Sequence, residues 1–254
     1  SIGLAVILVA LATASNAVAA TTIRPPARHT TPAVTAAGRT SVDGSDVTLR
    51  DVEASNKKVS MAYGALVTMW TARFKALGAR FVVPGIARYR GNALTECGVM
   101  HANNAQYCPE QNTIYFDDVF VARQVKAAAD ELGTDGDMVA VGIIAHEMGH
   151  AVQLQLGEGA GYPYERESAA DCLAGAFTQQ SQKDGSLEKG DLEEVFFGLA
   201  AAGDPTPEYT GDQRVNSQIA LRAHYLGHGT REERQANFNA GLKRGPGACV
   251  AAFR

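Results

Sequence analysis

The sequence lacks several features that would indicate particular classes of protein. Its net charge is only −4 over 254 residues, and no block of lysine and arginine occurs, so a nucleic-acid partner is not expected. No G-x-S-x-G segment is present, which leaves serine-hydrolase chemistry without support. The chain has four cysteines but no C-x-x-C pair, which argues against a structural zinc site made of cysteines. No internal repeat is found.

The first 46 residues lack the pattern of a folded domain. An uninterrupted run of small and aliphatic residues from Ile2 to Ala12 precedes Ala17-Val18-Ala19, which resembles a processing site. We therefore expect residues 1–19 to be a secretory signal peptide, or else a retained membrane anchor, since about 20 residues suffice to span a bilayer. Residues 20–46 are rich in Thr, Ala and Pro and show no periodicity, which predicts a flexible linker.

The cysteines agree with export, because disulfides persist outside the cytoplasm. Four cysteines allow three pairings. We predict a Cys97–Cys108 bond, since these residues bracket one loop, and a Cys172–Cys249 bond, which would tie the C-terminal tail to a helix. The expected location is secreted or extracytoplasmic, in the cell envelope, and any membrane association would come through residues 1–19.

Residues 47–254 have the composition of one globular domain, and their pattern is mostly helical with a few strands in the first half, which predicts an α+β fold. Strands are expected at Arg80–Tyr89, with a break at Pro84-Gly85, and at Thr113–Phe116. The polar stretch Asn92–Asn112 is expected to be a loop or a wide hairpin. Apolar spacing predicts helices at Val59–Leu77, Phe120–Leu132, Tyr164–Gln180, Leu187–Ala202, Gln213–Leu226 and Arg231–Leu242.

A further helix, Met138–Leu156, is apolar on nearly every face, which is typical of a helix buried in the centre of a domain. Thr134, Asp135 and Asp137 offer N-cap chemistry before it. The segment Asp135-Gly136-Asp137 also resembles the start of a calcium loop, but the remaining ligand positions are missing, so capping is the better interpretation.

This helix carries the segment His146-Glu147-Met148-Gly149-His150. His146 and His150 are four residues apart, so both imidazoles lie on one face and can bind one ion. Two histidines could share this spacing by chance, but imidazoles and a carboxylate are costly to bury on an apolar helix without partners. Zinc would remove that cost, and Glu147 is placed to act as general base toward a zinc-activated water.

A catalytic zinc needs a third protein ligand. The downstream candidates are Glu165, Glu167, Asp171, His224 and His228. Glu167 and Asp171 are four apart on a predicted helix, so one could bind zinc while the other holds a ligand imidazole by its free N–H. Glu165 is the main rival to Glu167. An exposed helix face is the usual place for such acids, but the apolar residues after Asp171 favour an inward face.

A second donor would help to stabilise the developing oxyanion of peptide hydrolysis. His228 follows a predicted helix and precedes Gly229 and Thr230, which would fix the turn. It could equally be a structural histidine near a helix C-terminus, and His224 is a close rival. No functional role is expected for His29 or His101, and Cys172 is not expected to bind the metal.

Several segments in the same order resemble a family of bacterial neutral zinc metallopeptidases, a group similar to the gluzincins. They are Cys97-Gly98, Tyr107-Cys108-Pro109, Ile114-Tyr115, Ile144 to Gln153, Glu167 through Gly175, and His228-Gly229-Thr230 with Arg234. The resemblance covers about Val47 to the C-terminus and implies a zincin-like fold. It also implies that Glu167 is the third ligand, that Asp171 is its neighbour in E-x-x-A-D, and that His228 belongs to a recurring motif. Glu233 stands where Gln is expected, and the first half is shorter.

The sequence therefore predicts an exported zinc metallopeptidase that acts on a protein or peptide substrate with Zn²⁺ as cofactor. One alternative is a catalytically silent binding or structural protein of the envelope on the same scaffold; the presence of Glu147 favours the enzyme, because such a scaffold needs no base. Another alternative is a zinc hydrolase of non-peptide amides, which the sequence hardly distinguishes from a peptidase.

Overall fold

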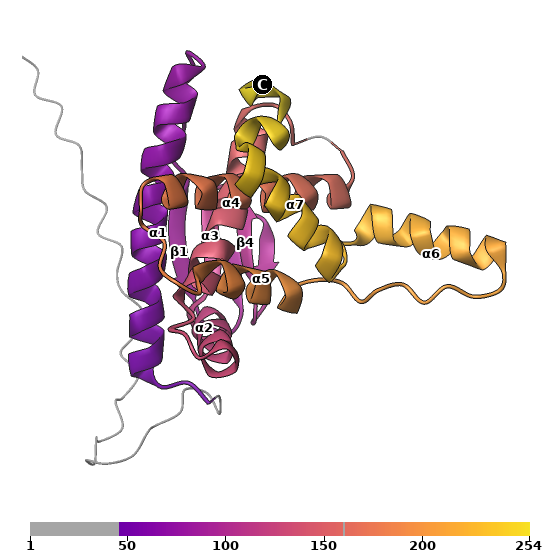
Figure 1. Ribbon diagram of the computed structural model, residues 1–254, viewed down its shortest axis with the longest axis horizontal. Helices are drawn as coiled ribbons and strands as arrows, with labels where there is room; N and C mark the ends of the chain where they lie inside the picture. Colours follow the sequence, from indigo (N-terminus) through magenta and orange to yellow (C-terminus); the bar gives the residue numbers. More distant parts are fainter. Residues whose placement is uncertain (1–45, 160) are drawn as a thin grey trace, which may run out of the picture. The chain divides into compact units, whose positions relative to one another are not determined.

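The computed structural model describes residues 46–159 and 161–254, which belong to one compact unit, Arg39–Arg254. The predicted signal or anchor, residues 1–19, and nearly all of the predicted linker lie outside the described residues. The unit is mostly helical and contains two small sheets in its first half, which confirms the predicted α+β class (Figure 1). Among the described residues, no helix has the length and apolarity needed to cross a membrane.

Helix α1 (Leu49–Ala76) begins ten residues before its predicted start at Val59. Thr48 explains where it starts. Its hydroxyl accepts a hydrogen bond from the Asp51 N–H, and the Asp51 carboxylate accepts one from the Thr48 N–H, which forms a capping box. The first turns bury Val52 against the rest of the unit. The local sequence is polar, so it does not reveal this tertiary contact.

The larger sheet has the strand order β1-β5-β4. β1 (Gly85–Tyr89) runs parallel to β5 (Thr113–Asp117), and β4 (Ala105–Cys108) pairs with β5 in the antiparallel direction. β2 (Ala93–Thr95) and β3 (Gly98–Met100) form a separate antiparallel hairpin.

Two predictions for this region are corrected. Residues 80–84 are not part of a strand, since β1 begins after the proline at Gly85. The stretch Asn92–Asn112 is not only a loop or hairpin, because it also contains β4. β4 pairs only with β5 and is thus an edge strand. Polar Gln106 within β4 and Asn104 just before it concealed the strand pattern.

The remaining helices agree with the predicted ones to within a few residues. They are α2 (Asp118–Leu132), α3 (Asp137–Gln155), α4 (Pro163–Lys183), α5 (Asp191–Ala201), α6 (Gln213–Leu226) and α7 (Arg231–Arg244), followed by short 3-10 turns at Pro246–Ala248 and Ala251–Phe253. α2 ends where predicted, at Gly133, which has a φ of 69°. A left-handed residue at this position is a common helix stop, and glycine adopts it without strain.

α3 lies in the middle of the unit, with α1 on one side and α4 on the other (Figure 1). Its buried residues point in all directions, as the sequence predicted, and include Ile144, Met148 and Val152. Gly149 lets α4 approach closely, because a Cβ at this position would lie 3.0 Å from the Cα of Ala170. The close approach brings the side chains of α3 and α4 to a shared site.

The start of α3 differs from the prediction. Its N-cap is Gly136, with a φ of 72° and no side-chain cap. The N–H groups of Gly136 and Met138 donate instead to the carboxylate of Glu194 on α5, at 3.1 and 2.8 Å. Asp137 forms an ion pair with Lys58 of α1. The local acids therefore do not cap this helix, and a distant glutamate does.

α4 and α7 are in backbone contact through two glycines. A Cβ at Gly175 would lie 2.0 Å from the Phe238 carbonyl oxygen, and one at Gly241 would lie 1.8 Å from the Cys172 carbonyl oxygen. The structure also contains disulfides between Cys172 and Cys249 and between Cys97 and Cys108, which are the pairs expected from the sequence. The first of these ties the tail after α7 to α4.

Candidate metal centre

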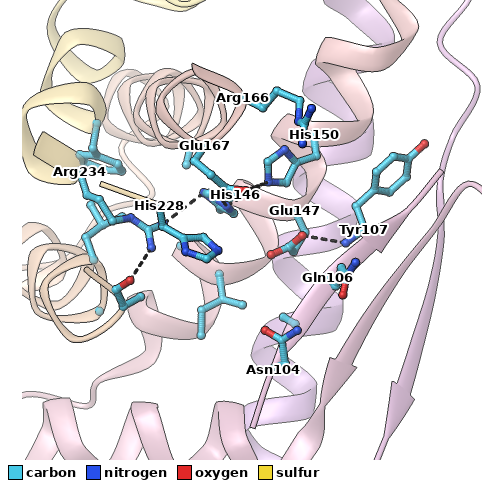
Figure 2. Close-up of a pocket in the computed structure, with 18 of the residues that line it drawn as sticks. Asn104, Gln106, Tyr107, His146, Glu147, His150, Arg166, Glu167, His228 and Arg234 are labelled. Carbon is cyan, nitrogen blue, oxygen red and sulfur yellow. Dashed lines mark hydrogen bonds and ion pairs between the residues drawn. The ribbon is translucent and has the colours of Figure 1, made fainter. Parts of the chain in front are cut away.

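The two histidines of α3 and one glutamate of α4 come together in the structure (Figure 2). The Nε2 atoms of His146 and His150 are 3.2 Å apart. The Glu167 carboxylate lies 3.0 Å from the His146 Nε2 and 3.5 Å from the His150 Nε2. Three potential ligand atoms from two packed helices thus surround one point.

The spacing of these atoms fits a zinc ion. Ligand atoms about 2.0–2.2 Å from a tetrahedral zinc lie about 3.3 Å from one another. The two histidine nitrogens are 3.2 Å apart, and they lie 3.0 and 3.5 Å from the two different oxygens of the Glu167 carboxylate. Two imidazoles and one carboxylate are also a ligand set that catalytic zinc sites use, with a fourth position left for water or substrate. These residues could therefore hold the metal that the sequence predicted.

Asp171 fixes the orientation of the His146 ring. The His146 Nδ1 and the Asp171 Oδ1 are 2.8 Å apart, so Nδ1–H donates to the carboxylate and Nε2 faces Glu167. Asp171 is fully buried. Arg234 of α7 balances its charge, with Nε and Nη2 donating to the two carboxylate oxygens at 3.0 and 2.7 Å. Arg234 also donates to the Ala202 carbonyl oxygen at the end of α5.

The carboxylates favour a positive charge at His146. Burial by itself lowers the pKa of His146, but the hydrogen bonds that its ring donates to Asp171 and Glu167 outweigh it and raise this pKa to about 10. Burial raises the pKa of Glu167, but the hydrogen bonds with His146 and His150 outweigh it, so the net shift is downward. A divalent cation would supply the positive charge in place of the proton.

Glu147 lies beside this group and faces the opposite wall. Its carboxylate accepts a hydrogen bond of 2.8 Å from the Tyr107 N–H, which belongs to the edge strand β4 (Figure 2). Glu147 is largely buried. One backbone N–H thus orients the carboxylate, and no donor among the described residues forms a hydrogen bond with its second oxygen.

These groups, except the fully buried Asp171, line a cavity of about 840 Å³. One wall is polar and comes from β4 and the residues before it. Another wall is apolar and comes from α3 and α5 on the N-terminal side of His146. The polar residues include Asn103, Asn104, Gln106 and Tyr107, and the apolar ones include Val139, Ile143, Val195 and Leu199.

The structure separates the two histidines that the sequence left as rivals. His228 lines the cavity. His224 instead packs against Tyr162 and Tyr164, with ring centroids 5.2 and 5.7 Å away. The backbone N–H groups of His228 and Gly229 both donate to Asp204, at 2.5 and 3.2 Å. This carboxylate fixes the turn that presents His228.

The remaining candidates lie elsewhere. Glu165 accepts a hydrogen bond from the Tyr162 N–H and completes a capping box at the start of α4. Cys172 is in a disulfide. His101 is exposed and does not line the cavity, and His29 lies outside the described residues. Asp135, Asp137 and Glu194 are close enough together to form a metal-binding group, but Lys58 pairs with the first two.

Sequence reasoning missed several residues that shape the site. Arg234 was part of the quoted motifs but had no assigned role, and its position on α7, 63 residues from Asp171, hid the contact. Nothing in the sequence pattern around Asp204 indicated its contact with the turn at His228. The Tyr107 N–H was missed because β4 was not predicted. Each of these contacts joins segments that are distant in the sequence.

Two imidazoles from one helix, a carboxylate from the next and a further glutamate in the same cavity are typical of zinc-dependent hydrolase sites. Comparison of the whole sequence with known families agrees. The chain belongs to the family described as "Putative neutral zinc metallopeptidase", whose model matches residues 1–253. The match extends further than the resemblance, which we expected to begin near Val47.

Two relatives from Escherichia coli, strain K12 and strain O6:H1 (CFT073), both carry the name Uncharacterized protein YpfJ. Each is 32% identical to this chain over an alignment of 197 residues, and the match covers 71% of this chain and 65% of the relative. The match thus spans slightly less than two thirds of the length of these relatives. Neither name assigns an activity or a substrate. No solved structure gives a significant match to the chain.

Proposed function

We propose that the protein is a zinc-dependent peptidase in which His146, His150 and Glu167 hold the metal. The observation that carries the proposal is the convergence of these three side chains: the two Nε2 atoms are 3.2 Å apart, and each lies 3.0 or 3.5 Å from one of the two oxygens of Glu167. A zinc ion bound in such a site supplies Lewis-acid polarisation of a water and of a substrate carbonyl. The buried Asp171 keeps the His146 ring in the orientation that leaves Nε2 free to bind.

Glu147 is the proposed general base. Its carboxylate is oriented by the Tyr107 N–H, which leaves the other oxygen to accept a proton from the attacking water. Glu147 can then carry that proton to the leaving amine. The buried position keeps the carboxylate close to the cavity and away from bulk solvent.

His228 is the proposed second donor to the developing oxyanion. It lines the cavity, and Asp204 fixes its backbone. Its ring is also 3.7 Å from the Asp204 carboxylate, from Nδ1 to Oδ1. A donor held in place before the reaction stabilises the charge without reorganisation during the reaction.

The polar wall of the cavity favours a peptide over other amides. β4 is an edge strand whose side away from β5 faces the cavity; the Tyr107 N–H on this side already donates to Glu147, so a substrate would pair with other backbone groups of this edge. An extended peptide can pair with such an edge through its own backbone groups. We therefore favour a protein or peptide substrate. The proposed export through residues 1–19 would place the enzyme outside the cytoplasm, in agreement with the two disulfides.

The test is hydrolysis of a labelled, unfolded general protein substrate by the purified chain. We expect about one zinc per chain, activity that a chelator abolishes, and recovery of activity on addition of zinc. Glu147→Gln is the matched control, because it preserves shape but cannot accept the proton. This variant should keep its zinc and lose most activity.

The outcomes separate the alternatives. Activity that survives removal of zinc, or a Glu147→Gln variant as fast as the parent, would contradict the proposed mechanism. A zinc-loaded parent that cleaves no protein or peptide but hydrolyses small amides would favour the non-peptide hydrolase. A zinc-loaded parent without either activity would favour a binding or structural role.

A further inference from the structure

The charged side chains that line the cavity nearly all have a partner that explains their position. The imidazoles of His146 and His150 face Glu167. The Arg234 guanidinium forms an ion pair with Asp171, and the His228 ring lies near Asp204. Arg166, on α4 beside Glu167, is the exception. It lines the same cavity, yet within residues 46–159 and 161–254 it forms no ion pair with a carboxylate.

Most hydrogen-bond donors of the Arg166 side chain have no protein acceptor among the described residues. Its Nη1 donates to the Gly161 carbonyl oxygen at 3.1 Å, which is a neutral acceptor and uses one of the five N–H groups of a guanidinium. The side chain is exposed toward solvent. A guanidinium with free donors can bind a carboxylate through two parallel hydrogen bonds.

The backbone of Arg166 is fixed relative to the metal centre. The Arg166 carbonyl oxygen accepts a hydrogen bond of 3.0 Å from the Gln153 Nε2, and Gln153 is only 2% exposed. Gln153 follows His150 by three residues on α3, and Arg166 precedes Glu167 by one on α4. The buried amide therefore ties Arg166 to both helices that supply the candidate ligands.

This arrangement gives the cavity two different ends along α3. Arg166 lies at the C-terminal end, beyond His150, because it contacts Gln153. The apolar wall around Ile143 and Val195 lies at the N-terminal end, before His146. Figure 2 shows Arg166 and His228 on different sides of His146. A bound chain would thus meet a free positive charge on one side of the proposed metal and an apolar surface on the other.

We propose that Arg166 binds a carboxylate of the substrate and so determines specificity, an inference that rests on the proposed peptidase function. A peptide can offer this carboxylate in two ways, as its C-terminal group or as an aspartate or glutamate side chain. Both have the same chemistry, and the guanidinium would accept either. The proposal predicts that the enzyme discriminates substrates by negative charge on the Arg166 side of the metal.

The test measures binding, so that it does not depend on turnover. Three pentapeptides of matched sequence are titrated by calorimetry into the zinc-loaded Glu147→Gln protein. The first has a C-terminal amide and no acidic residue, the second has a free C-terminal acid, and the third has a C-terminal amide and one glutamate. We expect at least one of the two acidic forms to bind about tenfold more tightly than the neutral form, as for one charge-assisted interaction near the surface.

Adding Arg166→Met should remove this preference and leave binding of the neutral peptide unchanged. Arg166→Lys should retain part of the preference, because it keeps the charge but not the planar fork. Arg50→Met, at an exposed arginine of α1 that does not line the cavity, is the control and should keep the full preference. Zinc content and thermal unfolding are measured for every variant.

Equal binding of the three peptides, no binding of any of them, or an unchanged preference in Arg166→Met would each overturn the inference. The form that gains from Arg166 identifies the source of the carboxylate. Failure of the peptidase proposal would appear separately, as a parent protein that cleaves no peptide although its zinc is bound. A parent that cleaves neutral and acidic peptides equally well would refute only the role of Arg166.

Discussion

The two acidic residues around His146 act on opposite atoms of one imidazole. Asp171 accepts the proton of Nδ1, and Glu167 faces Nε2. An imidazole presented to a metal in this way is oriented and made more basic by its carboxylate partner. Arg234 donates hydrogen bonds to both oxygens of Asp171, and these bonds keep that carboxylate from turning toward the candidate metal site.

The first prediction distinguishes the glutamates of α4. Glu167→Ala should lower zinc affinity strongly, because it removes one of the three proposed protein ligands. Glu165→Ala should leave zinc affinity nearly unchanged, because Glu165 caps the helix and does not reach the histidines. Asp171→Asn should give an intermediate loss of roughly 10- to 100-fold. Zinc affinity is measured by competition with a chelator of known strength, and the reverse order for Glu165 and Glu167 would contradict the assignment.

The second prediction concerns His228. His228→Ala should retain zinc and lower kcat, since loss of one oxyanion donor typically costs about 2.7–4 kcal/mol, or roughly 10²- to 10³-fold in rate. His224→Ala is the matched control, because His224 packs among tyrosines outside the cavity. Turnover and zinc content are measured on the same samples.

Two other results would change the assignment of His228. Loss of zinc from His228→Ala would make it a ligand, and an unchanged kcat would leave it with a structural role. Asp204→Ala gives a further check, since it removes the acceptor of the His228 and Gly229 N–H groups. A fall in kcat without loss of zinc in this variant would agree with Asp204 as a positioning residue.

At the scale of elements, α3 depends on a residue of another helix for its start. The third prediction is that Glu194→Ala destabilises the protein by about 2 kcal/mol, since it leaves the N–H groups of Gly136 and Met138 without their acceptor. Burial raises the pKa of the Glu194 carboxyl, which reflects how little solvent reaches it. The measurement is denaturant unfolding.

Glu193→Ala is the matched control, because Glu193 is the exposed neighbour of Glu194 on α5. A surface change of this kind usually alters stability by no more than about 0.5 kcal/mol. Equal effects of the two substitutions would show that Glu194 does not cap α3.

Most elements could be predicted from the sequence, and the exceptions have physical causes. The bounds of α6 were predicted correctly, and α3 was predicted to within one residue at each end. β4 was missed because this short edge strand has little apolar alternation: it carries the exposed Gln106 and follows the polar residues Asn103 and Asn104. The start of α1 was missed because its first turns are stabilised by contacts with the rest of the unit.

At the scale of the whole molecule, the two disulfides close loops of different length. Cys172 and Cys249 are 77 residues apart, and Cys97 and Cys108 are 11 apart. In the chain-entropy model the longer loop contributes about 4.5 kcal/mol and the shorter one about 2.8 kcal/mol. The bond to Cys249 also holds the C-terminal tail, where Phe253 packs against Trp70 and Phe74.

The fourth prediction follows from this difference. Replacing Cys172 and Cys249 together by serine should lower the free energy of unfolding more than replacing Cys97 and Cys108. Thermal unfolding of the two double variants, each compared with the parent under oxidising conditions, measures the effect. A larger loss for the Cys97 and Cys108 pair would show that loop length is not the dominant factor.

The sequence by itself determined which side chains of α3 could share one metal ion. The spacing of His146 and His150 places both imidazoles on one helix face, because the helical repeat is a local property of the backbone. The same argument paired Glu167 with Asp171. Local spacing also indicated which cysteines would pair across the short loop.

The tertiary structure alone decided which distant residues complete the site. It chose Glu167 over Glu165 and His228 over His224 as neighbours of the cavity, and it added Arg234 and Arg166. These choices depend on how closely α4 and α7 pack and where the turn before α7 is fixed. Such packing arises from contacts between residues far apart in the chain, so the periodicity of apolar residues within one helix or strand does not predict it.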